Sequence, residues 1–282
     1  MTKRLSILTL ATWVLLSSRS AAQEGTSIIL ATTTGTYDSG LLDSLLPRFE
    51  RESGIRVKVI AVGTGAALAM AGRGDADAIL VHAPRREMEY VRSGDIMEGR
   101  LVMHNDFVLL GPPDDPATVK SCRELTCAMR AVARTGPFVS RGDRSGTHEM
   151  ELALWRLAGV SPDSVKDRVE SGQGMGATLD IAGQRSAYTI SDRGTFMAHP
   201  AGQRMAIMSE GDPVLLNIYH AYVVNPARHP AVNLAGARKF LAFMVAPATQ
   251  QRIGEFGRSR YGRSLYIPDA GRDSTRLHEE PR

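Results

Sequence analysis

Short β-rich runs alternate with helical patterns along most of the chain, and this alternation restricts the possible folds strongly. An apolar run at residues 27–31 precedes leucines at one-turn spacing, a β-rich run at 56–62, a second helical pattern and a third run at 78–81. This order predicts a parallel sheet with right-handed crossovers, in an α/β fold. Such sheets bind ligands at the carboxyl ends of their strands, beside helix N-termini.

Four of the predicted strand-to-helix junctions combine glycine with hydroxyl side chains. They cover residues 32–36, 63–65, 140–147 and 172–178. The N-terminus of a helix exposes N–H groups at the positive end of the helix dipole and favours anions. Glycine allows close backbone approach, and Ser or Thr adds O–H donors. The four junctions together favour an anion site, with plain helix caps as the alternative.

Arg141 is the most specific candidate for a side chain that binds an anion, because it follows a predicted strand and precedes a helix start. A guanidinium there can pair with an oxyanion through two parallel hydrogen bonds. The alternative is a surface arginine paired with Asp143 or Glu149. Asp143 and Ser145 are both suitable N-caps for the following helix, and we expect Arg144 to lie in solvent.

Two longer apolar runs, at residues 105–110 and 215–224, bracket a middle segment of normal domain size. We expect them to cross between two lobes, with the binding site in the cleft. The expected division is 23–108 and 216–267 for one lobe and 109–215 for the other. Residues 268–282 are polar and are expected to be disordered.

The first 22 residues have the pattern of a cleavable secretory signal. Lys3 and Arg4 precede the apolar segment Leu5–Leu16, and small residues end at Ala22, where we place cleavage. An uncleaved anchor helix is the alternative. No later window has the ~20 apolar residues of a membrane span, so we expect an exported protein.

Composition excludes two broad classes. Hydrophobic residues make up 43% of the chain, which excludes wholesale disorder. Removing the three basic residues of the signal leaves 31 basic and 30 acidic residues. A nearly neutral mature chain argues against nucleic acid or another general polyanion as a partner.

The only two cysteines are Cys122 and Cys127, within a predicted helical stretch at residues 116–134. In an exported protein they are most simply a disulfide. Residues five apart on a regular helix lie too far apart, so a disulfide requires a broken turn or a loop.

Catalytic chemistry finds little support. Residues 142–146 resemble a nucleophile elbow, but Asp143 occupies the first glycine position and no matching triad can be assigned. His148 and Glu151 could share a helix face as metal ligands, yet no third ligand is evident. His82 follows a strand and stays unassigned. We expect no enzyme, no cofactor and no bound metal of the protein's own.

At the level of motifs the chain resembles the tungstate-binding proteins of bacterial ABC-type uptake systems. The resemblance extends from about Ile28 to Pro268, and its most specific pieces are the three consecutive threonines and the segment at 140–148. The other matching segments are 38–42, 62–65, 81–82, 105–107, 111–112, 172–176, 188, 192–195 and 217–219.

The resemblance implies a two-lobed periplasmic binding protein of type II. Such a protein has two parallel or mixed sheets with helices on both faces and two crossing strands as a hinge. It also implies that the threonine-rich loop, Arg141, Ser145 and Thr147 bind an oxyanion. With the glycine-rich junctions, the expected site is Thr32, Thr33, Thr34, Gly63, Thr64, Arg141, Ser145, Gly146, Thr147 and Gly176.

The implied partners are tungstate or molybdate and an ABC transporter permease in the inner membrane. The protein is expected to be a periplasmic monomer. Tungstate carries no proton at neutral pH and needs only donors, whereas phosphate favours an acceptor such as a carboxylate. The same fold binding molybdate or sulfate, or a secreted enzyme for phosphorylated substrates, are the alternatives. One departure is Gly35, where the family usually has Ser, so a hydroxyl is lost.

Overall fold

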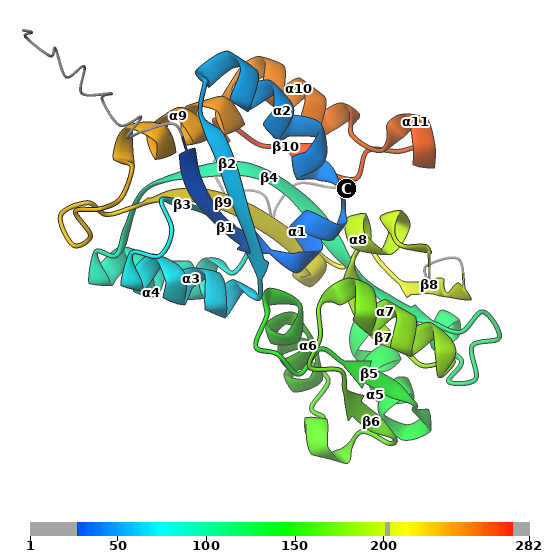
Figure 1. The fold of residues 1–282 in the computed structure, drawn as a ribbon. Helices are drawn as coiled ribbons and strands as arrows, with labels where there is room; N and C mark the ends of the chain where they lie inside the picture. The colour runs from blue at the N-terminus through cyan, green and yellow to red at the C-terminus, as the bar shows by residue number, and fades with distance from the viewer. Residues whose placement is uncertain (1–26, 201–203, 273–282) are drawn as a thin grey trace, which may run out of the picture.

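The computed structural model describes residues 27–200 and 204–272, which form two lobes (Figure 1). The predicted signal at residues 1–22 lies outside the described residues. The strands are β1 (Ser27–Thr33), β2 (Arg56–Val62), β3 (Ala78–Val81), β4 (Ile96–Gly111), β5 (Phe138–Ser140), β6 (Arg168–Glu170), β7 (Thr189–Asp192), β8 (Ala206–Ser209), β9 (Leu216–Val224) and β10 (Ile267–Pro268). The α-helices are α1 (Thr34–Asp38), α2 (Leu41–Ser53), α3 (Thr64–Arg73), α4 (Pro84–Ser93), α5 (Leu125–Thr135), α6 (Gly146–Leu157), α7 (Met175–Gln184), α8 (Arg193–Ala198), α9 (Leu234–Val245), α10 (Pro247–Glu255) and α11 (Arg258–Tyr261).

The first lobe contains the predicted parallel unit. Strand β1 pairs in parallel with β2 on one side and with β3 on the other, which confirms the β-α-β-α-β prediction. Strand β9 runs antiparallel between β3 and β4, so the complete sheet is mixed. The carboxyl ends of β1 and β2 and the N-termini of α1 and α3 therefore lie at one edge of this sheet.

Helices cover both faces of this sheet because its central strands are apolar on both sides. Along β1, Ile28 and Leu30 pack into a core with α2, α9 and α10, whereas Ala31 packs into a core with α3. Successive side chains of a strand point to opposite faces, so a continuous apolar run requires cover on both. The two groups of helices are visible above and below the sheet in Figure 1.

Strand β4 connects the lobes. Residues 96–106 pair with β9, and residues 107–111 pair with β7 and β8 of the second lobe. An isolated bridge from Phe138 to Tyr188 places β5 beside β7, and β6 pairs with β5. Phe107 and Leu109 pack with α5 and α6, and Val108 and Leu110 pack with α7, so the second sheet is also covered on both faces.

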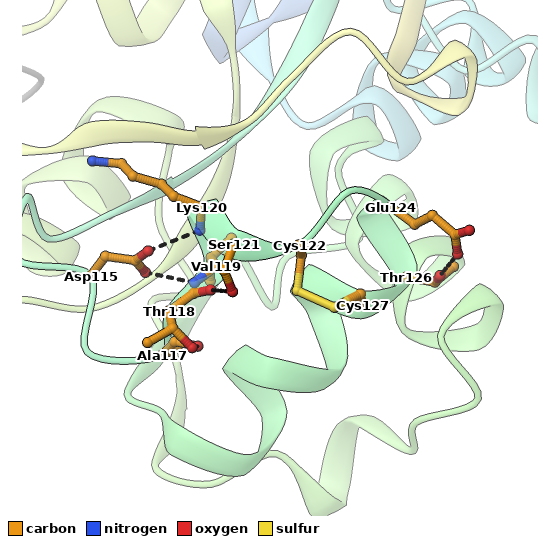
Figure 2. The surroundings of a disulfide bond; sticks show 10 residues. All are labelled: Asp115, Ala117, Thr118, Val119, Lys120, Ser121, Cys122, Glu124, Thr126 and Cys127. Carbon is orange, nitrogen blue, oxygen red and sulfur yellow. Dashed lines mark hydrogen bonds between the residues drawn. A yellow bond between two sulfur atoms is a disulfide. The ribbon is translucent and has the colours of Figure 1, made fainter.

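The cysteines form a disulfide where the helix is interrupted. A 3₁₀ turn covers Val119–Ser121, and α5 begins only at Leu125, so the predicted helix at 116–134 is broken between the cysteines. The carboxylate of Asp115 accepts hydrogen bonds from the N–H groups of Val119 and Lys120 and holds this turn (Figure 2). The Cα atoms of Cys122 and Cys127 are 5.6 Å apart, a separation suited to a disulfide.

Order extends past the predicted start of the tail. Pro268 pairs with Met103 at the edge of β4, and Asp269 is 1% exposed and hydrogen-bonds His104. The prediction of a disordered tail from residue 268 is therefore wrong for these two residues, because an edge strand supplies them with partners. Residues 273–282 lie outside the described residues. No helix within 27–200 or 204–272 has the length and apolar character needed to cross a membrane.

Candidate functional site

The four glycine- and hydroxyl-rich junctions, which are far apart in sequence, meet where the two lobes face each other. A Cβ atom placed on Gly174, at the start of α7, would lie 3.5 Å from Cβ of Thr34, at the start of α1. A Cβ atom on Gly63, which precedes α3, would lie 3.5 Å from Cβ of Ser145, which precedes α6. The N-termini of four helices thus converge from both lobes.

Two of the four junctions have a side-chain cap at the helix start. The hydroxyl of Thr33 accepts a hydrogen bond from the Thr36 N–H at 3.3 Å and caps α1. Ser145 caps α6 in the same way. Gly63 is the N-cap of α3 and supplies no side-chain acceptor, so the N–H groups of its first turn can bind a ligand.

Arg141 lies at this meeting point. It directly follows β5, its residue is 3% exposed, and its Nη2 lies 3.5 Å from Thr34 Oγ1 in the other lobe. Nη2 also pairs with the carboxylate of Asp143. The alternative prediction, a surface arginine paired with Asp143, is therefore wrong about the exposure of Arg141 but correct about its ion-pair partner. Arg144 is exposed, as predicted.

Buried polar atoms without partners gather around this point. Thr64 Oγ1, Arg141 Nε and His82 Nδ1 are fully enclosed and have no hydrogen-bond partner among the described residues. A Cβ atom on Gly146 would lie 3.1 Å from both Thr64 Oγ1 and His82 Nδ1, so these two atoms border the same spot. Buried polar groups are normally paired. Two of these atoms, Thr64 Oγ1 and Arg141 Nε, can donate, and unpaired donors at a junction of helix N-termini indicate a site for an acceptor-rich ligand.

His82, which follows β3, is a site residue that the sequence pattern left unassigned. Its Nε2 lies 3.2 Å from Thr33 Oγ1, and its ring is tilted against the ring of Tyr219 with centroids 4.7 Å apart. Burial lowers the pKa of His82 to about 4, so the imidazole is neutral at physiological pH. Its sequence signals were its position directly after a predicted strand and its place in the matching segment 81–82.

Nearby carboxylates are occupied by donors of the protein. Asp143 Oδ1 accepts the Ser145 N–H at 3.0 Å while its other oxygen pairs with Arg141, so Asp143 braces the loop and does not cap α6. Asp192 Oδ1 accepts the Thr195 N–H at 2.8 Å. The Asp38 carboxylate accepts a hydrogen bond from the Gly176 N–H, although burial raises its pKa. Each of the three carboxylates therefore has a partner within the protein.

Not all predicted site residues can offer their side chains to a ligand. The hydroxyl of Thr32 donates to the Leu80 carbonyl at 2.8 Å inside the sheet, so Thr32 is a strand residue and its assignment to the site is wrong. The hydroxyl of Thr33 is engaged by His82 and by Thr36. The remaining predicted residues lie at the meeting point, and they are Thr34, Gly63, Thr64, Arg141, Ser145, Gly146, Thr147 and Gly176.

Gly35 occupies a position where an added side chain would crowd its neighbours. A Cβ atom there would lie 2.8 Å from Asp192 Oδ2 and 3.2 Å from Thr195 Oγ1 of the other lobe. Thr195 Oγ1 donates to the Gly35 carbonyl at 3.0 Å. The glycine at position 35, which lacks the hydroxyl, thus allows a close contact between α1 and α8.

A buried polar network holds Ser140, the residue that precedes Arg141. Glu151 Oε2 accepts the hydroxyl of Ser140 at 2.6 Å, and Oε1 accepts hydrogen bonds from Trp155 Nε1 and Arg168. Glu151 is therefore a structural residue of the second lobe, and its ion pair with Arg168 is 2% and 12% exposed at the two side chains. Trp155 is connected through Glu151 to the residue that precedes Arg141.

Comparison with known proteins identifies the family of this chain. Residues 20–248 match the PBP superfamily domain. The tungstate-binding protein TupA of Peptoclostridium acidaminophilum is 44% identical over 249 residues, which cover 87% of each chain. The structure of the tungstate ABC transporter from Geobacter sulfurreducens is 41% identical, with a TM-score of 0.75, and the match covers 82% of this chain and 98% of that one. For tungstate-binding protein TupA from Desulfovibrio alaskensis G20 the identity is 42%, the TM-score 0.72 and the coverage 86% and 99%. The chain belongs to the PBP superfamily and, within it, to the family of these tungstate-binding proteins.

Proposed function

We propose that this protein is a periplasmic solute-binding protein that captures tungstate between its lobes and delivers it to an ABC transporter. The observation that carries the proposal is the pair of unpaired, buried donors, Thr64 Oγ1 and Arg141 Nε, at the convergence of four helix N-termini. Relatives named for tungstate binding support the choice of ion. The binding residues are Thr34, Gly63, Thr64, Arg141, Ser145, Gly146 and Thr147. The N–H of Gly176 is bonded to Asp38, so Gly176 contributes only a close approach of the backbone.

The donor set suits an unprotonated dianion. Hydroxyl groups, backbone N–H groups and the Arg141 guanidinium donate hydrogen bonds to the oxyanion. The carboxylates of Asp38, Asp143 and Asp192 already accept hydrogen bonds or an ion pair from groups of the protein, which makes them poor acceptors for a protonated ion. Because Asp143 offsets the charge of Arg141, the helix dipoles supply much of the compensation. Molybdate, with the same charge and shape, is compatible with the site.

Capture follows from closure and involves no covalent chemistry. The site is complete only when α1 and α3 of one lobe face α6 and α7 of the other, so the bound ion favours the closed state. We retain the division into residues 23–108 with 216–267 and residues 109–215 as part of this proposal. The permease of the transporter then receives the ion from a monomeric, closed complex.

Calorimetric titration of the purified mature protein with tungstate, molybdate, sulfate and phosphate tests the function. We expect tungstate to bind most tightly, molybdate next and phosphate weakly. Tighter binding of sulfate or phosphate would refute the assignment. Turnover of a chromogenic phosphate ester would instead support a secreted enzyme.

The proposed location also has a direct test. Mass spectrometry of exported protein should give a mature start at Gln23, immediately after the signal. Recovery of Met1 in a membrane fraction would contradict cleavage and favour an anchor helix.

A further inference from the structure

One ion pair joins the lobes away from the crossing strands. Nη1 of Arg86, on α4 of the first lobe, lies 2.7 Å from Glu149 Oε1, on α6 of the second lobe. The two side chains are 30% and 35% exposed, so the pair is partly shielded from water. The other ion pairs found within residues 27–200 and 204–272 either lie inside one lobe or involve Asp106 on the crossing strand β4.

The start of α4 is anchored so that Arg86 faces the second lobe. The neighbouring Glu87 is fully buried, and its Oε1 accepts the Ala83 N–H at 2.7 Å. Its Oε2 is bound by His220 and by the hydroxyl of Tyr222 on β9. These bonds fix the first turn of α4 to the sheet and leave Arg86 pointing across the cleft.

Gly65 makes room for this side chain. A Cβ atom on Gly65, in the first turn of α3, would lie 2.6 Å from Arg86 Nη1 and 2.9 Å from Nη2. The guanidinium therefore rests on the backbone of one of the four converging helices. Any larger residue at position 65 would displace Arg86 from Glu149.

Arg86 also contacts the loop that carries Arg141. Its Nη1 donates to the Arg144 carbonyl at 3.3 Å, within the turn between Arg141 and Ser145. The Arg144 N–H donates to His148 Nδ1 at 3.0 Å, so this turn is tied to the first turn of α6. A single side chain thus holds both the helix and the loop that the second lobe contributes to the anion site.

We propose that Arg86 is a positioning residue for anion capture. Its bonds to Glu149 and to the Arg144 carbonyl stabilise the closed arrangement of the lobes and slow release of the ion, although Arg86 does not touch the ion. The consequence for capture rests on the proposed function, whereas the effect on closure does not.

The test compares Arg86→Gln with Arg85→Gln, a matched control on the same helix whose arginine is exposed and has no ion pair among the described residues. Tungstate affinity is measured by calorimetry, and release is followed by stopped-flow fluorescence of Trp155. We expect Arg86→Gln to raise Kd about tenfold, mainly through faster release of the ion. The reason is that the variant loses a partly shielded ion pair that holds the two lobes together. Arg85→Gln should leave both values unchanged.

A charge swap separates positioning from general damage. Arg86→Glu places two carboxylates together and should weaken binding more than Arg86→Gln does. The double variant Arg86→Glu/Glu149→Arg should restore most of the affinity lost by Arg86→Glu, because the pair is rebuilt in reverse. Equal Kd values for Arg86→Gln and Arg85→Gln, or no recovery in the swap, would overturn the proposal.

Closure is also measured without any ion. In small-angle X-ray scattering of the anion-free protein, Arg86→Gln should increase the radius of gyration relative to Arg85→Gln. If the wild-type protein did not bind tungstate, the proposed function would fail, but an expanded Arg86→Gln protein would still support the role in closure. An unchanged radius would count against that role independently of the ligand.

Discussion

Replacing Arg141 with alanine should weaken tungstate binding by at least ~100-fold. The buried guanidinium contributes charge-assisted hydrogen bonds of about 1.5–3 kcal/mol each. A loss of about 1.4 kcal/mol in binding free energy corresponds to a factor of ten in Kd. The structure adds a second cause. Arg141 pairs with Asp143, so its removal leaves a carboxylate without its cation beside the bound dianion. This repulsion should make the loss larger than that of the hydrogen bonds alone.

The two causes can be separated by calorimetry on a set of variants. Arg141→Ala/Asp143→Asn should bind tungstate more tightly than Arg141→Ala, because the uncompensated carboxylate is gone. Arg141→Lys should recover only part of the affinity, since an ammonium cannot form the planar fork. Arg144→Ala is the control, because Arg144 is exposed, and it should change little. A larger loss for Arg144→Ala than for Arg141→Ala would refute the placement of this loop.

Three further changes test other parts of the structure. Gly35→Ala should raise Kd about tenfold by calorimetry, since its Cβ would lie 2.8 Å from Asp192 Oδ2 and overpack the lobe contact; an unchanged Kd would show that Asp192 moves aside. The pKa of His82 falls from 6.5 to about 4 on folding, so the unfolded chain binds a proton at a higher pH than the folded protein does. Acidification through this range should therefore lower the free energy of unfolding by up to about 3 kcal/mol. Urea unfolding at several pH values should show this loss of stability in the wild-type protein but not in His82→Gln. If the unfolding free energies of the two proteins changed with pH in the same way, the prediction would be contradicted. Reduction of Cys122 and Cys127 should leave tungstate affinity nearly unchanged, because the disulfide contributes no site residue; a clear change in Kd would show coupling.

The local pattern of the sequence was sufficient for the architecture of the first lobe. Strands β1, β2 and β3 have bounds within two residues of the apolar runs at 27–31, 56–62 and 78–81. Apolar periodicity and glycine at helix ends are short-range signals, and they act over a few turns of one element. For the same reason, the four junctions and Arg141 could be singled out as anion-binding candidates without a structure.

Pairing between distant residues was not accessible in this way. The sequence left His82 unassigned, because its partners Thr33 and Tyr219 lie far from it along the chain. Thr32 shares its residue type with Thr33 and Thr34, yet its side chain points into the sheet toward Leu80. Only the register of β1 beside β3 decides which of the three hydroxyl groups reaches the cleft.

The contacts between the lobes are the part that tertiary structure alone decided. Gly35 appeared as a lost hydroxyl, but its meaning depends on the Asp192 carboxylate, 157 residues further along the chain. Arg86 and Glu149 are separated by 63 residues and become partners only when α4 and α6 face each other across the cleft. A sequence specifies which groups can donate or accept, whereas their meeting depends on how β4 and β9 carry the chain between the lobes. The chemistry of the anion site is therefore local in origin, and its completion is a property of the closed fold.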